Sequence, residues 1–205
     1  MRPEYDAELL DETLLGTLTG FVRSLASTEP SFGNANALLK YGRGYSSLRR
    51  KPEWLRVGEQ GRCFKNATLY ALARDDVFYA EGYAIDPYFP VPIQHAWLVD
   101  PAGKVIDPTW SGTTDHIYFG IAFRSSFVAE QLLHNKEEPG ILVNINLMRH
   151  RLRSSEAIEN EVIRGQAELS HSTVHAFKIA LPGKVGLHEP RCLIGGIPAL
   201  DGGTF

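Results

Sequence analysis

The chain has 205 residues, of which 43% are hydrophobic and 22% charged, proportions typical of a soluble globular protein and incompatible with disorder throughout. Its formal net charge of −3 provides no general attraction to nucleic acid or to an anionic membrane, and no apolar run approaches the roughly 18 residues of a membrane span. The acidic N-terminus lacks the pattern of a secretory signal, and two cysteines are too few for a disulfide framework or a four-cysteine zinc site. We therefore expect a reducing, cytoplasmic setting.

An amphipathic helix is the first predicted element. Over residues 7–25, leucine, phenylalanine and valine recur every three to four positions, which indicates one apolar face. Residues 26–40 are rich in turn-forming residues. The five basic residues of segment 40–51 suit a solvated loop or helix face, with anion or nucleic-acid contact as the alternative.

The middle of the chain alternates between helix and strand signals. We predict, in order, a helix from Cys63 to about residue 75, a strand over 77–85, a proline-rich loop, and strands over 94–99, 104–109 and 116–123. The sequence Asp-Pro-Ala-Gly at 100–103 is a strong turn signal between two of these strands. This order of elements predicts an α+β fold with an antiparallel sheet.

The last third of the chain contains weaker signals. They predict a helix over 126–133, a strand over 141–147, a helix over 154–169 and an irregular glycine- and proline-rich tail. We accordingly divide the chain into an N-terminal helical segment (1–52), a central core (53–150), a C-terminal helix and strand (151–181) and the tail (182–205).

Cys63 lies where a glycine-containing turn leads into a predicted helix. The positive end of the helix dipole and the free N–H groups there favour a thiolate, which is the nucleophilic form of cysteine. The same N–H groups can stabilise the oxyanion of a tetrahedral intermediate. A lone cysteine can equally be a small buried apolar residue, so the interpretation depends on its neighbours.

His95 and Asp107 lie in the two strands that flank the predicted turn. If residues 101–103 form a three-residue loop, Trp97 lies opposite Asp107 and His95 lies opposite Thr109. His95 and Asp107 then project from one face of the sheet as diagonal neighbours, with Cβ atoms within about 8 Å of each other. A two-residue turn would put them on opposite faces. A carboxylate between apolar strand neighbours requires a partner, and the histidine can supply it.

Four short segments in this order resemble the transglutaminase-like branch of the papain-like cysteine enzymes. They are GRCFKNA at 61–67, EGY at 81–83, HAWLVD at 95–100 and VIDPTW at 105–110. The resemblance covers about 50 residues and implies a nucleophile that opens a helix packed on an antiparallel sheet.

The resemblance implies a Cys–His–Asp triad in which Cys63 is the nucleophile, His95 the general base and Asp107 the residue that orients the histidine. The predicted oxyanion and substrate-binding residues are Gln60, Asn66, Trp97 and Trp110, the two tryptophans as shields of the His–Asp pair. The implied function is a cysteine hydrolase, a peptidase or amidase that cleaves an amide, isopeptide or ester bond through a thioester. An acyltransferase, a transglutaminase or deamidase, and a non-catalytic binding module on the same fold are the alternatives.

We predict no cofactor and no metal site. His171 and His175 are four residues apart, but no third ligand is near them in the sequence, and Cys192 is treated as a bystander. The expected partner is a peptide, a protein or a small amide or acyl substrate. Nucleic-acid binding is disfavoured because the chain is acidic overall, and no membrane contact is expected.

Overall fold

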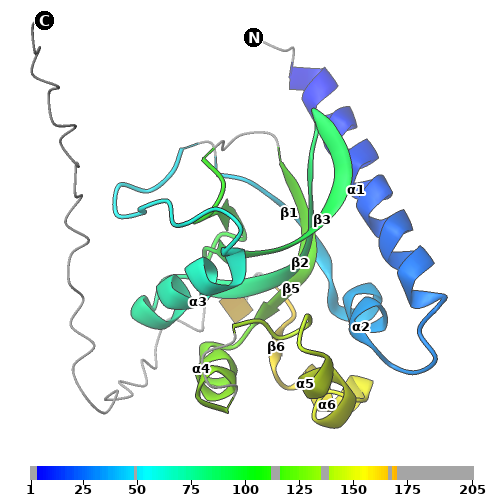
Figure 1. Cartoon of the computed structure of the whole chain (residues 1–205). Coiled ribbons are helices and arrows are strands. Elements are labelled where there is room, and N and C mark those ends of the chain that lie inside the picture. Colours follow the sequence, from blue (N-terminus) through cyan, green and yellow to red (C-terminus); the bar gives the residue numbers. More distant parts are fainter. Residues whose placement is uncertain (1–3, 49, 112–115, 135–138, 166–167, 170–205) are drawn as a thin grey trace, which may run out of the picture.

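A computed structural model describes residues 4–48, 50–111, 116–134, 139–165 and 168–169. Figure 1 shows the described helices and strands. The helices are α1 (Glu4–Ala26), α2 (Asn34–Tyr41), α3 (Cys63–Ala73), α4 (Ser125–His134), α5 (Ile145–His150) and α6 (Ser155–Glu159). The strands are β1 (Arg43–Ser46), β2 (Phe78–Asp86), β3 (Phe89–Val99), β4 (Val105–Ile106), β5 (Ile117–Phe123) and β6 (Val162–Ile163).

The strands form one antiparallel sheet in the order β1-β5-β2-β3-β4, and β6, outside this order, pairs with Ala122 and Phe123 at the end of β5. The two central strands, β2 and β5, are buried along almost their whole length. β5 (117–123) therefore pairs with strands far from it in the sequence, namely β1 and β2 before it and β6 (162–163) after it. The described part of the chain has the α+β architecture that the sequence predicts.

The helices pack on one face of this sheet. Strand residues of that face include Tyr79, Leu98 and Phe123, and they share one hydrophobic core with apolar residues of α1, α2, α3 and α4. Alternation along each strand sends these side chains to the helices and their neighbours to the opposite face. The core of the protein lies between the sheet and the helices, with α1 and α2 over β5 and α3 over β2 and β3 (Figure 1).

The opposite face of the sheet carries a second core built around Trp97. This indole lies across Gly120 of β5, where an added Cβ would be 2.5 Å from its Cη2 atom. Alanines at 80, 84 and 122 continue the row of small residues on this face. The small side chains leave room for a layer of aromatic rings, and this layer surrounds His95.

The structure confirms the predictions that depend on local pattern. The helix over 7–25, the helix beginning at Cys63, and the strands over 77–85 and 116–123 are present with small shifts of their ends. The three-residue hairpin loop is also present. Asp100 N–H donates to the carbonyl of Lys104 at 3.0 Å, and Gly103 has φ of 76°.

Several other predictions are wrong. The proline-rich stretch is a turn only at residues 87–88, and from Phe89 onward it belongs to β3, which runs through Pro90 and Pro92 where its register with β2 shifts. Residues 141–147 do not form a strand, because segment 141–143 is bound by a buried carboxylate and Asn144 starts α5 as its N-cap. The helix over 154–169 ends at Glu159 and is followed by β6.

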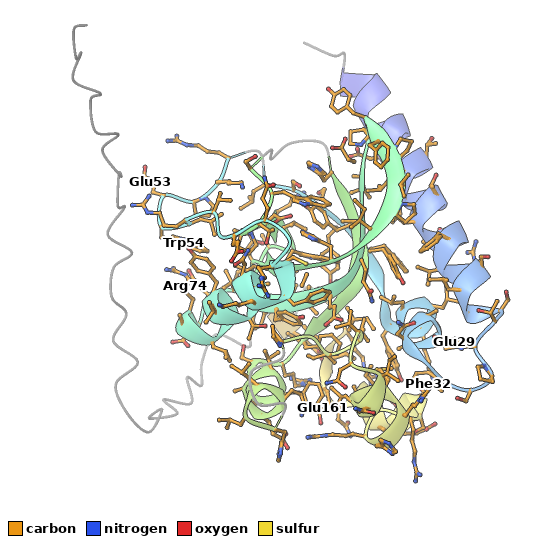
Figure 2. The ribbon with its side chains drawn as sticks, viewed as in Figure 1. Glu29, Phe32, Glu53, Trp54, Arg74 and Glu161 are labelled. Atoms are coloured by element: carbon orange, nitrogen blue, oxygen red, sulfur yellow. The ribbon has the colours of Figure 1, made fainter. Side chains whose placement is uncertain are left out.

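The turn-rich region and the basic segment also contain regular structure. Residues 34–41 form α2, whose first N–H groups are bound by the Glu29 carboxylate, with bonds of 2.9 Å from Ala35 and 3.0 Å from Asn36. Glu29 lies beside α2 in Figure 2. The basic segment contributes β1 to the sheet edge. The tail over 182–205, the histidines at 171 and 175, and Cys192 lie outside the described residues. Among the described helices, none has the length and apolarity needed to cross a membrane.

Candidate active site

The hairpin between β3 and β4 brings His95 and Asp107 together. Leu98 lies opposite Ile106 and Val99 opposite Val105, which is the register that a three-residue loop imposes. Both functional side chains therefore reach the same face of the sheet. His95 Nε2 is 2.8 Å from Asp107 Oδ2, and both side chains are buried.

Asp107 is held as a carboxylate by four donors. Besides the imidazole, the hydroxyl of Tyr118 donates to Oδ2 at 2.9 Å, and the backbone N–H groups of Thr109 and Trp110 donate to Oδ1 at 2.7 and 3.0 Å. Burial alone would raise the pKa of Asp107, but the hydrogen bonds and the charge of His95 outweigh it and lower the pKa. An ionised carboxylate only accepts hydrogen bonds, so His95 must present Nε2–H to it.

Cys63 is the first residue of α3, and its buried side chain lies beside the His95 ring, close enough to help raise the pKa of that histidine. Because Nε2 is used by Asp107, Nδ1 is the nitrogen left to exchange a proton with the thiol. Burial disfavours the charged imidazole. Hydrogen bonds to Asp107 and Cys63 and the charges of these two residues favour it, and together they raise the pKa of His95 to about 9. The site thus favours an imidazolium at neutral pH.

The start of α3 reaches the histidine at an open part of the sheet edge. Among the described residues, β3 pairs with β4 only at Leu98 and Val99, so the edge of β3 at His95 is left to other elements. α3 packs on β3 and β2. Gly61, with φ of 77°, turns the chain into the helix just before the cysteine.

Two tryptophans lie next to the histidine. The Trp110 ring stacks on His95 with centroids 4.1 Å apart and an interplanar angle of 16°. The Trp97 ring is 6.4 Å from His95 at 18° and is fully buried. A flat indole over an imidazolium excludes water and favours the positive charge through its ring electrons. Both tryptophans therefore lie where the sequence analysis expects them to shield the His–Asp pair.

Asn66 connects α3 to the segment after Asp107. Its Nδ2 donates to the carbonyl of Glu59 at 2.9 Å and to Thr109 Oγ1 at 3.0 Å. Both amide hydrogens are used, so the described geometry makes Asn66 a structural bridge between the start of α3 and the segment after Asp107. Gln60 is exposed in the turn before Cys63 and remains the candidate oxyanion donor from a side chain.

The loop that leads to Cys63 is fixed at several further points. Trp54 packs between the Arg74 guanidinium, 4.0 Å from its ring centroid, and Tyr70, whose ring centroid is 5.6 Å away. Figure 2 shows Trp54 and Arg74 together at the end of α3. Gly58 N–H donates to the carbonyl of Pro108 at 2.7 Å, which joins the loop to the residue after Asp107. These contacts fix the positions of Cys63 and Asp107 relative to each other.

The sequence analysis does not identify two residues of this site. Tyr118 comes from β5, and its hydroxyl orients Asp107. Lys51 comes from the basic segment, and its Nζ donates to the carbonyl of Trp110 and, at 3.3 Å, to that of Asp107. Burial lowers the pKa of Lys51, although the Asp107 charge opposes this. The one available signal for Tyr118 was its aromatic strand position, which does not reveal the pairing of β5 with β2.

The described residues contain no group of three or more histidine, cysteine or acidic side chains arranged to hold a metal ion. The comparisons with known proteins add no family: no family model, no curated protein and no solved structure matches the chain. The functional argument therefore depends on the geometry of the site itself.

Proposed function

We propose that this protein is a cysteine hydrolase that cleaves an amide, isopeptide or ester bond through a thioester on Cys63. The observation that carries the proposal is the buried chain of contacts from Asp107 through His95 to the thiol at the start of a helix. The triad order and the surrounding motifs resemble papain-like and transglutaminase-like enzymes, and the α+β architecture is compatible with that core.

In the acylation step, the thiol proton passes to His95 Nδ1 and the thiolate attacks the carbonyl carbon of the substrate. The carbonyl oxygen becomes an oxyanion at the N-terminus of α3, where the backbone N–H of Cys63 and the Gln60 amide are the proposed donors. The imidazolium then protonates the leaving amine or alcohol. The C–N or C–O bond breaks, and the acyl group remains on sulfur.

In the deacylation step, His95 takes a proton from water, and the hydroxide attacks the thioester carbon. The C–S bond breaks, and the sulfur recovers the proton through the imidazolium. Asp107 keeps Nε2–H in place throughout both steps. An amine in place of water would give acyl transfer, so product analysis with and without an added amine distinguishes hydrolase from acyltransferase.

The first experiment measures how fast iodoacetamide alkylates Cys63 between about pH 5 and pH 10, with site-resolved mass spectrometry. Because the pKa of His95 is raised to about 9, the imidazolium persists across the neutral range and can stabilise the thiolate. We expect Cys63 to react well below pH 8, where an ordinary thiol with a pKa of about 8.5 reacts slowly. We expect His95→Ala to remove this reactivity.

Cys192 serves as an internal control in the same digest, and Cys63→Ala is the blank for later assays with amide and thioester substrates. If Cys63 reacts no faster than Cys192 below pH 8, or if its reactivity is indifferent to His95→Ala, no catalytic thiolate–imidazolium pair exists. The proposed function then fails.

A further inference from the structure

The segment from Asp107 to Trp110 is held through its N–H groups and through its carbonyl groups. The Asp107 carboxylate accepts the N–H groups of Thr109 and Trp110. Lys51 Nζ donates to the carbonyl of Trp110 and, at 3.3 Å, to the carbonyl of Asp107. One ammonium group therefore joins the first and the last residue of the segment. The acid that orients His95 and the ring that stacks on His95 are tied to the same lysine.

The position of Lys51 follows from the pairing of the chain before it. Ser47 forms an isolated parallel bridge with Val105, and Leu48 N–H donates to the carbonyl of Val105 at 3.0 Å. Because paired parallel segments run in the same direction, the chain that leads to Lys51 accompanies the chain that leads to Asp107. The two residues meet although they are 56 positions apart in the sequence.

The Trp110 ring lies at the margin of the core rather than inside it. Trp110 is only partly buried and packs against the second core around Trp97. Its ring stacks on His95, and its centroid is 4.6 Å from that of His116. A ring that is not enclosed keeps its orientation only if its backbone is fixed, and Lys51 binds the carbonyl of this residue. The stack on His95 therefore depends on the hydrogen bonds of Lys51.

Charge and position give opposite expectations for Lys51. Its ammonium lies close enough to Asp107 for the two charges to interact, so its own charge disfavours a second cation, the imidazolium, on the same carboxylate. The stacked indole of Trp110 favours the imidazolium through its ring electrons. Removal of the ammonium should thus raise the pKa of His95 if charge dominates and lower it if position dominates.

We propose that Lys51 is a positioning residue of the active site, which keeps Trp110 stacked on His95 by holding the backbone of residues 107–110. This inference rests on the proposed function and adds to it a residue that acts through the Trp110 ring. The stacked ring favours the imidazolium that pairs with the Cys63 thiolate. The lysine thus supports the reactive form of the cysteine.

The test compares substitutions of Lys51 in the full chain. Lys51→Met keeps an apolar stem and removes the charge and the N–H donors, whereas Lys51→Arg keeps both. A small cavity adjoins Lys51 and Asp107 and gives the longer arginine room to adjust. Lys104→Met is the matched control, because Lys104 Nζ donates an exposed hydrogen bond of 3.0 Å to a serine of β1. Melting temperatures establish that each variant is folded under the conditions used.

Two readouts follow the stack and its effect. In protein with ¹³C-labelled histidine, the ring current of Trp110 shifts the NMR signals of the His95 ring, and Trp110→Ala supplies the positions of these signals without the stack. The same spectra, recorded against pH, give the pKa of His95. The second readout is the rate at which iodoacetamide alkylates Cys63 at pH 7.

We expect Lys51→Met to move the His95 signals towards those of Trp110→Ala and to lower the pKa of His95. Alkylation of Cys63 should slow by about three- to thirtyfold, the range that corresponds to loss of a cation–π contact. Lys51→Arg should keep most of the original stack and rate, and Lys104→Met should keep both in full.

A rise in the pKa of His95 in Lys51→Met would show that the lysine acts through its charge, and it would overturn the inference. Unchanged His95 signals in Lys51→Met, or an equal change in Lys104→Met, would do the same. Trp110→Ala with the original alkylation rate overturns the inference even if Lys51→Met does not fold.

The two readouts also separate this inference from the proposed function. If the His95 signals respond as expected but Cys63 has no His95-dependent reactivity, the role of Lys51 is supported and the cysteine hydrolase is rejected. If Cys63 has that reactivity and keeps it undiminished in Lys51→Met, only the role of Lys51 is rejected.

Discussion

Asp107→Asn is expected to lower turnover by about 10³- to 10⁴-fold. The reason is that His95 Nε2 donates a hydrogen bond to the carboxylate but must accept one from the asparagine NH₂ group. The backbone N–H groups of Thr109 and Trp110 both donate to one side-chain oxygen, so the carbonyl of the asparagine stays there. The NH₂ group then faces His95 Nε2, which must accept. The imidazole is left in the tautomer with its proton on Nδ1, where it cannot take the thiol proton.

Two measurements test this result without knowledge of the substrate. The pKa of the His95 ring, followed by NMR, should fall from about 9 by more than about one unit, since its hydrogen bond to a carboxylate and the negative charge are gone. Alkylation of Cys63 at neutral pH should slow in parallel. Tyr118→Phe is the matched control, because it removes a different hydrogen bond to Asp107 and keeps the charge.

Stability gives an independent check of the same pair. The pKa of His95 is raised above its ordinary value of 6.5, so the stability that it contributes is complete below about pH 6.5 and is lost as the pH rises through about 9. The difference in Tm between the original protein and Asp107→Asn should therefore be largest near pH 6 and shrink by pH 10. A His95 pKa that stays near 9 in the variant would show that Asp107 does not control the base.

The His95–Asp107 pair could be predicted from the sequence, on the condition that the turn is a three-residue loop, because its geometry is local. A short turn fixes the register of the strands on either side of it, and register fixes which side chains share a face. The observed pairing of Leu98 with Ile106 agrees with the loop that Gly103 permits. The helix start at Cys63 is likewise a local property of the residues around it.

The remaining parts of the site depend on contacts between distant segments. Tyr118 reaches Asp107 only because β5 pairs with β2. Lys51 becomes part of the site only because the chain before Cys63 folds against residues 107–110. No local sequence pattern predicts the contact of Tyr118 with Asp107 or that of Lys51 with residues 107–110. The strand predicted over 141–147 is wrong for the same reason, because the carboxylate that binds segment 141–143 belongs to Glu81 in the distant strand β2.

The second large effect is expected from Glu81, a fully buried carboxylate on the helix-covered face of β2. The Tyr79 hydroxyl and the Ile141 N–H donate to Oε2 at 2.8 and 2.7 Å, and the Val143 N–H donates to Oε1 at 2.7 Å. This carboxylate therefore holds segment 141–143. A methyl group at Gly140 would be 3.6 Å from Phe64 Cδ1, so the held segment lies beside the first turn of α3.

Glu81→Ala should lower the free energy of unfolding by about 3–5 kcal/mol, because it opens a cavity and leaves two buried donors and one partly buried donor without an acceptor. Urea denaturation at neutral pH measures the loss. Glu130→Ala is the matched control. Its carboxylate forms an ion pair with Arg151 at 2.8 Å, but both side chains are largely exposed, and such pairs contribute about 1 kcal/mol or less.

The pH dependence of stability separates the effect of the Glu81 charge on stability from the effect of the size and shape of its side chain. Burial raises the pKa of Glu81 above 4.5 despite its hydrogen bonds, so the folded protein binds this proton more tightly than the unfolded chain does. Stability from this group is then complete below about pH 4.5 and is lost as the pH rises through the raised pKa. Glu81→Gln cannot titrate, so the stability of the original protein relative to this variant should fall as the pH rises above about 4.5. A relative stability that rises over this range, or a loss in Glu81→Ala no larger than in Glu130→Ala, would contradict the role assigned to Glu81.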